Sequence, residues 1–348
     1  MSDVIGGSTA GGGGGSGADT RVGIGLVHTV LPTVRTALGD LPEFSGLTPE
    51  EAEFARGSGI ETVGVLEDTT AGDLAALAVR GLLERLDGLA DGPRAAERPD
   101  TLMLVGPRAP DVLLGSDACR VQAEAKLDGT FAFTLDGLGC TGSSAAWALG
   151  RDLLLADPAR RSVLIAHGSR PTGLDRVRYP VTVIGDGGYA MTLVRGGRPV
   201  LRAHRQETDG TFHDLFRVDY KQVPYYEWRE ECASPDRYRF ELAMNSRMRL
   251  ARMVDEVLAE AGVEKSGVAT TLMQNVTASA YQFYETLLGL PVHPVCGEHL
   301  AAYGHLGAMD VVLNLDRLLA SGELAPGDLV LVLNNSPVAA WAVTLWEV

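Results

Sequence analysis

The stretch "LDGLGCTGSS", residues 135–144, places a cysteine, Cys140, between glycines and directly before an apolar run of small residues. A second stretch, "AYGHLGAMDVVLNLDRLL" at residues 302–319, has the same shape, but His305 stands where the first carries its cysteine. With these two residues aligned, further positions match: Gly139 with Gly304, Gly142 with Gly307, and Leu153–Leu154 with Leu318–Leu319. The match indicates an internal repeat of two copies.

The segments that follow the two loops also come in the same order. Both halves are expected to carry an apolar helix and then a buried strand: residues 141–156 and 162–169 in the first half, 304–322 and 329–336 in the second. A helix that is apolar on most sides must be buried on most sides. The repeat therefore predicts an α/β fold of two similar halves with their central helices between sheets. It also brings the loops of Cys140 and His305 to one shared site.

The chain is predicted to have three parts. Residues 1–20 are expected to be a flexible Gly-rich tail, because they cannot bury enough apolar surface to offset the entropy of ordering. Residues 21–175 would form the N-terminal half with Cys140, and residues 176–348 the C-terminal half with His305. Further strands are expected at 21–32, 99–107, 130–140 and 267–275, and further helices at 69–89, 116–127, 237–263 and 277–290.

Composition excludes several classes of function. The chain has 348 residues, of which 45% are hydrophobic, and a net charge of −15, whereas a nucleic-acid binder needs a basic surface. Neither an apolar run of about 18 residues nor the apolar core of a signal peptide is present, so we expect no membrane contact and a cytoplasmic location. Four cysteines without a CxxC pair fit a reduced compartment better than disulfides or a metal site. Arginines cluster in "RVRY", residues 176–179, and in "NSRMRLARM", residues 245–253, and could receive an acidic partner or a phosphate, although surface arginines usually have no such role.

Four segments resemble the thiolase superfamily and, within it, the ketoacyl-ACP synthase III group: residues 135–150, 181–197, 303–319 and 329–345. They are similar, in that order, to the nucleophile segment, the Gly-Asp-Gly turn between two strands, the segment of the catalytic asparagine and the closing strand pair. The resemblance spans about residues 20–348. It implies a five-layer α-β-α-β-α sandwich and a homodimer formed through an edge strand, here "FAFTLDG".

Two departures from the condensing enzymes of that group decide the expected chemistry. Those enzymes carry a histidine in a His-Gln-Ala-Asn segment, but "LMQNVTAS", residues 272–279, has none. They carry an asparagine in the later glycine loop, where this sequence has His305. A subgroup with this change resembles acyltransferases, whose working set is Cys, His and Asp. By that resemblance the set here is Cys140, His305 and Asp310.

The residues themselves also favour Cys140 as a nucleophile. A thiolate attacks a thioester, and a helix N-terminus lowers the pKa of a cysteine and offers free N–H groups. The N–H of Cys140 could hold the oxyanion with a second donor from the turn around Ser336. A lone cysteine is more often a small buried hydrophobe, so the repeat and the resemblance carry this assignment.

His305 could deprotonate Cys140 and later the O–H or N–H of an acceptor. Asp310 is the carboxylate nearest in sequence that could fix the tautomer of His305. Five residues along a regular helix would put the two about 140° apart, so the triad requires His305 to lie in a non-helical turn. Otherwise Asp310 is simply a charge that stabilises a helix N-terminus.

Three further assignments concern the walls of the site. Gln274 and Asn275 could hydrogen-bond an acyl carbonyl or a pantetheine amide, although such residues also satisfy their own backbone at a strand end. The polar and aromatic segment 211–240 is expected to shape the acceptor pocket, and the alternative is a decorated surface loop.

The sequence therefore predicts an acyltransferase. It would move an acyl group from an ACP or CoA thioester, through Cys140, to the hydroxyl or amine of a small-molecule acceptor in natural-product biosynthesis, without any cofactor. Two alternatives stay open: a decarboxylating condensing enzyme, and an inactive partner subunit of one. Retention of Cys140 argues against the inactive subunit. The sequence does not identify the acyl group or the acceptor.

Overall fold

The computed structural model describes residues 21–89, 98–171, 173 and 175–348, so the predicted tail lies outside the described residues. The helices are α1 (Pro49–Gly57), α2 (Ala71–Asp87), α3 (Asp117–Glu124), α4 (Gly142–Ala156), α5 (Ala243–Ala261), α6 (Ala278–Leu288), α7 (Pro294–Tyr303) and α8 (Asp310–Ser321). The strands are β1 (Val22–Val30), β2 (Arg35–Ala37), β3 (Thr62–Gly64), β4 (Thr101–Val105), β5 (Phe131–Leu135), β6 (Ser162–Ser169), β7 (Val177–Arg178), β8 (Thr182–Val183), β9 (Gly187–Arg195), β10 (Val200–Thr208), β11 (Phe216–Arg217), β12 (Glu231–Cys232), β13 (Val268–Met273), β14 (Leu329–Ser336) and β15 (Ala340–Glu347).

Nine strands form the central β-structure, in the order β13-β14-β15-β10-β1-β9-β6-β4-β5. The register between β1 and β10 consists of the pair Gly23 and Val200, so the strands divide there into two sheets that touch at one corner. A side chain on Gly23 would lie 2.4 Å from the carbonyl oxygen of Pro199, which explains the glycine at this crossing. One sheet comprises β5, β4, β6, β9 and β1, and the other β10, β15, β14 and β13.

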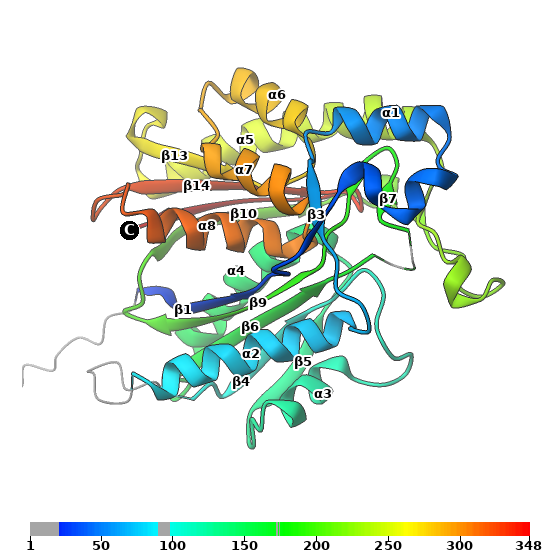
Figure 1. Cartoon of the computed structure of the whole chain (residues 1–348). Coiled ribbons are helices and arrows are strands. Elements are labelled where there is room, and N and C mark those ends of the chain that lie inside the picture. The colour runs from blue at the N-terminus through cyan, green and yellow to red at the C-terminus, as the bar shows by residue number, and fades with distance from the viewer. Residues whose placement is uncertain (1–20, 90–97, 172, 174) are drawn as a thin grey trace, which may run out of the picture.

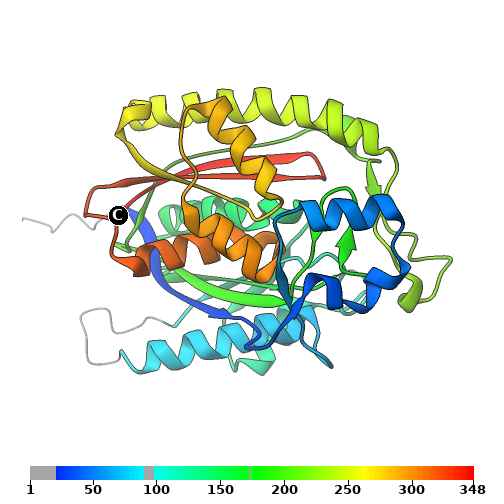
Figure 2. The same cartoon turned by 45° about the horizontal axis from the view of Figure 1, so that its top comes forward.

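The helices and sheets alternate in five layers, as the resemblance implied (Figure 1). Helices α2 and α3 cover the outer face of the first sheet, and α5 and α6 cover the outer face of the second (Figures 1 and 2). Between the sheets lies a layer that contains α4 and α8. The predicted thiolase-like α/β sandwich is therefore confirmed, and it sets α4 and α8 side by side beneath the loops that precede them.

Small residues allow α4 to fit between the two sheets. Gly150 faces the first sheet so closely that a side chain there would lie 2.9 Å from Leu193 of β9. Trp147 fills the space toward the second sheet, where its ring meets that of Trp346 edge to face at 5.3 Å. Both tryptophan side chains are fully buried, so their burial is a large part of what holds the central layer to β15.

Two expectations about helix starts change in the structure. The helix predicted at 304–322 begins at Asp310, after a 3-10 turn over Gly307–Met309. The helix predicted at 237–263 begins regular α geometry at Ala243, after a π-helical turn over Arg237–Leu242. The first of these changes matters for the chemistry, because it leaves His305 in a non-helical turn.

The predicted boundary at residue 175 does not coincide with the change from one sheet to the other. Strand β9 pairs with β1 and β6, so the first sheet continues as far as residue 195. The chain enters the second sheet at β10. The division into two halves as folding units stays a prediction. Among the described residues, no helix is both long enough and apolar enough to span a membrane.

Candidate active site

Cys140 lies in a tight turn between β5 and α4. The turn, Gly139–Thr141, is a 3-10 helix, and Gly139 has a φ of +51°. A side chain on Gly139 would lie 2.4 Å from Ser336 Oγ, so this position requires glycine for both its backbone and its close contact. The amide of Asn334 donates to the carbonyl oxygen of Cys140 at 2.9 Å. The nucleophile loop is thus fixed by the end of β14.

His305 is held by the segment that leads into β9. Its N–H donates to the carbonyl oxygen of Val183 at 2.9 Å, and its carbonyl accepts from the N–H of Gly185 at 3.1 Å. Gly304, with φ of +69°, makes the turn between the end of α7 and the backbone of His305. The ring then reaches Cys140, with His305 Nε2 at 3.1 Å from the Sγ atom.

Asp310, the first residue of α8, completes the set. His305 Nδ1 donates to Asp310 Oδ2 at 2.5 Å, which leaves Nε2 toward Cys140 and fixes the tautomer. The same carboxylate accepts the N–H of Asn275 at 2.8 Å and that of Leu306 at 2.7 Å. His305 and Asp310 are fully buried, so these bonds are shielded from water. The structure therefore brings together the three residues expected to act.

The charges in the site favour a thiolate beside an imidazolium. Burial alone would raise the pKa of the Cys140 thiol, but His305, followed by Arg108 and Arg178, lowers it below its ordinary value. Burial alone would lower the pKa of His305, but Asp310 and Cys140 raise it to about 9. Cysteine thiolates of this kind are the reactive form toward thioesters.

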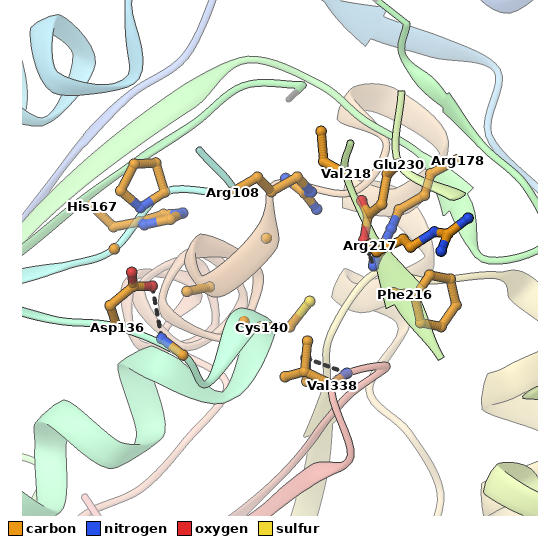
Figure 3. A pocket seen from close by; sticks show the side chains of 17 residues that line it. Arg108, Asp136, Cys140, His167, Arg178, Phe216, Arg217, Val218, Glu230 and Val338 are labelled. Atoms are coloured by element: carbon orange, nitrogen blue, oxygen red, sulfur yellow. Dashed lines mark hydrogen bonds and ion pairs between the residues drawn. The ribbon is translucent and has the colours of Figure 1, made fainter. Parts of the chain in front are cut away.

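Two cavities meet at Cys140. The larger, of about 530 Å³, is lined by both Cys140 and His305 and lies between residues 180–181, the start of α5 and α6. The smaller, of about 260 Å³, is lined by Cys140 but not by His305, and Figure 3 shows its wall. Segment 211–240, which was expected to shape the acceptor pocket, contributes to both cavities: residues 216–218 and 230 line the smaller one, and residues 238–239 line the larger one.

The three tentative wall residues have different surroundings. Ser336 lines the smaller cavity beside Gly139. Gln274 lines the larger one, but its side-chain amide hydrogen-bonds Asn335 through both its oxygen and its nitrogen. Asn275 lines neither cavity. It is fully buried, and its backbone N–H supports Asp310, so its place is behind the site.

Several residues at the site were not identified from the sequence. Asn334 anchors Cys140, and Arg108 and His167 line the smaller cavity. Arg178 belongs to the cluster "RVRY", which was the one available signal for it. Its neighbour Arg176 instead forms a buried ion pair with Asp186 at 2.7 Å.

Comparisons with known proteins show which sequences and structures this chain is similar to. Residues 258–348 match the family model described as the C-terminal part of 3-oxoacyl-[acyl-carrier-protein] synthase III. A β-ketoacyl-[acyl-carrier-protein] synthase III from Alkalilimnicola ehrlichii is 27% identical over 274 residues, which cover 77% of this chain and 81% of that protein. The enzyme of the same name from Erythrobacter litoralis is 26% identical, over 71% and 77% of the two chains.

Solved structures share the fold at low sequence identity. The 3-oxoacyl-(acyl carrier protein) synthase III of Pseudomonas aeruginosa superposes with a TM-score of 0.76 at 20% identity, over 94% of this chain and 98% of that one. ChlB3, described as an acyltransferase, gives a TM-score of 0.77 at 24% identity over the same shares. Together, the comparisons show that this chain is similar to ketoacyl-ACP synthase III enzymes over most of its length and that it shares their fold.

Proposed function

We propose that this chain is an acyltransferase that carries an acyl group on Cys140, from a CoA or ACP thioester to the hydroxyl or amine of a small-molecule acceptor. The observation that supports this most is the chain of contacts from Cys140 through His305 to Asp310. A thiolate, a base and a carboxylate that orients the base are the groups that acyl transfer between heteroatoms requires.

In the first step, the thiolate of Cys140 attacks the carbonyl carbon of the donor thioester. The N–H groups of Cys140 and Ser336 are the proposed donors to the oxyanion. When the intermediate collapses, the carbon–sulfur bond to the donor breaks and the departing thiolate takes the proton of His305. An acyl-Cys140 thioester and a neutral imidazole remain, and no cofactor is needed.

In the second step, neutral His305 removes the proton of the acceptor's O–H or N–H as it attacks the acyl-enzyme. Collapse of this intermediate breaks the carbon–sulfur bond to Cys140 and regenerates the thiolate beside imidazolium. Asp310 stabilises that imidazolium, as its contact with Nδ1 allows. The acyl group leaves on the acceptor, and the thiolate–imidazolium pair is ready for another donor.

The runner-up is a decarboxylating condensing enzyme, which the names of the relatives favour. Such a reaction needs hydrogen-bond donors for the enolate that forms as CO2 leaves. Among the described residues that line the larger cavity, His305 supplies the one imidazole, and the amide of Gln274 is already bonded to Asn335. The wall of the larger cavity therefore supports heteroatom transfer better than condensation.

The test separates loading from discharge. The protein is incubated with a set of acyl-CoA and acyl-ACP donors, and intact mass reports one acyl group on Cys140; model alcohols and amines then discharge it. Malonyl thioester is tested in parallel for CO2 release. If CO2 appears in step with product, the chain is a condensing enzyme; if no donor loads the protein, it is an inactive partner subunit.

We also propose that the chain acts as a cytoplasmic homodimer in natural-product biosynthesis. Strand β5 lies at the edge of the first sheet, and its Phe131 is exposed. Unpaired edge strands are sites for pairing with a second chain. Light scattering at micromolar concentration should give twice the mass of the chain; the mass of a single chain would contradict the dimer.

A further inference from the structure

The position of His305 determines which cavity holds which part of the substrates, if the proposed function is correct. The departing thiol takes a proton from His305 and the acceptor gives one to it, so both must bind on the His305 side of Cys140. That side is the larger cavity, which His305 lines. The acyl chain extends from the same carbonyl carbon in another direction. The smaller cavity, which reaches Cys140 but not His305, is the space available to it.

The wall of the smaller cavity contains an arginine, Arg108, that makes no direct ion pair with a described residue. Arg108 lines it, and no described residue forms a hydrogen bond or ion pair with its guanidinium. The second arginine in the wall, Arg178, pairs with Glu230 and lies over the ring of Phe216 at 4.8 Å. Burial together with Arg178 lowers the pKa of Arg108, although Cys140 and Glu230 act in the opposite direction without bonding to it. An anion beside Arg108 would stabilise the charged form of its guanidinium.

The remaining charges at this cavity lie at its rim. Asp136 is exposed and its carboxylate accepts the N–H of Gly137 at 2.7 Å. Arg217 is exposed and pairs with Glu231 at 3.2 Å. Because both groups are solvated and engaged, neither compensates the charge of Arg108. In Figure 3 the guanidinium of Arg108 lies between His167 on one side and the Arg178–Glu230 pair on the other.

His167 shows that the opposite wall is polar as well. Its Nδ1 lies 3.0 Å from the carbonyl oxygen of Val105 and donates to it, so Nε2 carries a lone pair. That Nε2 is buried and has no partner among the described residues. A Cβ atom added to Gly307 would lie 3.3 Å from His167 Nε2 and 3.5 Å from the guanidinium of Arg108, so both groups face the space beside this glycine. A hydrocarbon chain in this space would leave both groups without a hydrogen bond, which is costly.

We propose that the smaller cavity selects a short acyl group that ends in a carboxylate, the half-thioester of a dicarboxylic acid, with Arg108 as the residue that binds the carboxylate. A volume of about 260 Å³ is below that of sites for drug-sized ligands, which supports a short chain. Arg178 adds positive potential from the side of Glu230. A water molecule between the carboxylate and His167 Nε2 satisfies that atom without placing two acceptors in contact.

The test compares donors that differ in the carboxylate alone. Malonyl-, succinyl- and glutaryl-CoA are paired with propionyl-, butyryl- and pentanoyl-CoA, and the rate of Cys140 loading is followed by intact mass. In wild type, the best dicarboxylic donor should load about 10- to 100-fold faster than its uncharged partner, the range expected for a hydrogen bond to a charged group. Equal or faster loading by the uncharged partner would overturn the inference and leave the proposed function standing.

Variants assign the effect to one residue. Arg108→Gln should remove most of the preference, Arg108→Lys should keep part of it, and loading by the uncharged donor shows that each variant is folded. The matched control is Arg80→Gln, which makes the same change of charge at an arginine of α2 that pairs with Glu124 of α3 at the surface. This variant should leave the preference intact. A preference that survives in Arg108→Gln would contradict the role of Arg108. Failure of every donor to load wild type would instead contradict the proposed function.

Discussion

Cys140 and Cys296 are both buried cysteines beside the start of a helix, yet their surroundings make them chemically opposite. Cys140 lies two residues before α4, and Cys296 lies in the first turn of α7. The pKa of Cys140 is lowered, whereas burial raises the pKa of Cys296 to about 12. A helix N-terminus is therefore not sufficient to make a cysteine reactive in this fold.

The difference lies in what faces each sulfur. Cys296 Sγ meets two neutral donors, the N–H of Met273 at 3.5 Å and the side-chain amide of Asn314 at 3.4 Å. The imidazole on the same helix, His299, is turned to Asn314 at 2.7 Å instead. Cys140 faces an imidazole and opens to two cavities, and Cys296 lines neither of them. A neighbouring cation and an opening to the cavities together distinguish the nucleophile, Cys140, from the core residue, Cys296.

The largest expected effect comes from removing the nucleophile. Cys140→Ala should gain no acyl mass from any donor thioester, because the sulfur that forms the covalent bond is absent. Cys296→Ala should load like wild type, measured by intact mass under the same conditions. Equal loading of Cys140→Ala and wild type would place the nucleophile elsewhere.

The second prediction compares the two thiols by alkylation at different pH values. Thiolate exists above the pKa, so Cys140 should react with iodoacetamide well below the ordinary thiol range, and its rate should fall only as the pH drops through its lowered pKa. With a pKa of about 12, Cys296 would be about 10⁻⁵ thiolate at pH 7. Peptide mapping after a short pulse should find the label on Cys140. Rapid labelling of Cys296 in the folded protein would contradict the comparison.

The third prediction concerns His305→Ala. Loss of a general base should slow transfer from acyl-Cys140 to an acceptor by about 10²- to 10⁴-fold. Loading should be slowed less, because the helix N-terminus and the two arginines still favour the thiolate. The alkylation midpoint of Cys140 should move to higher pH, since burial remains and its main cationic partner is gone. Discharge as fast as in wild type would show that His305 is not the base.

Asp310→Asn should have a smaller effect, on the order of 10- to 100-fold in discharge, because Asp310 acts by orienting His305. An asparagine oxygen in the place of Oδ2 can still accept from His305 and from the N–H of Asn275, but the amide nitrogen in the place of Oδ1 cannot accept the N–H of Leu306. The acyl-enzyme should still form. The measurement is the discharge rate together with thermal unfolding, which separates a loss of orientation from a loss of folded protein.

The same residues show which parts of the site could be predicted from the sequence. The repeat predicted that Cys140 and His305 would meet, because equivalent loops of two stacked halves face each other, and the glycines marked where those loops turn. Asp310 came from the resemblance and from being the nearest carboxylate in sequence, on the condition that His305 lies in a non-helical turn. These are local patterns, which a sequence displays directly.

The remaining features depend on contacts between distant segments. Arg108 follows β4 in a loop without periodicity, so nothing in the sequence pointed it at Cys140. Asn275 was a candidate for binding an acyl carbonyl or a pantetheine amide, with a structural role as the alternative; its N–H binds Asp310, and its side-chain oxygen accepts from Tyr281 and Asn314. The position of β9 in the sheet depends on its pairing with both β1 and β6. The pattern of apolar and polar side chains along the strand does not specify these partners.

The smallest expected effect is that of Cys296→Ala on stability, and it shows which role a buried sulfur plays away from the site. The change removes one buried heavy atom and an acceptor for weak bonds from Met273 and Asn314, so it should cost about 1 kcal/mol in the free energy of unfolding. Loading and discharge rates should stay at wild-type values, because Cys296 contacts neither cavity. Denaturant unfolding measures the first and intact mass the second. A loss of activity without loss of stability would mean that Cys296 takes part in the chemistry, and the distinction between the two cysteines would fail.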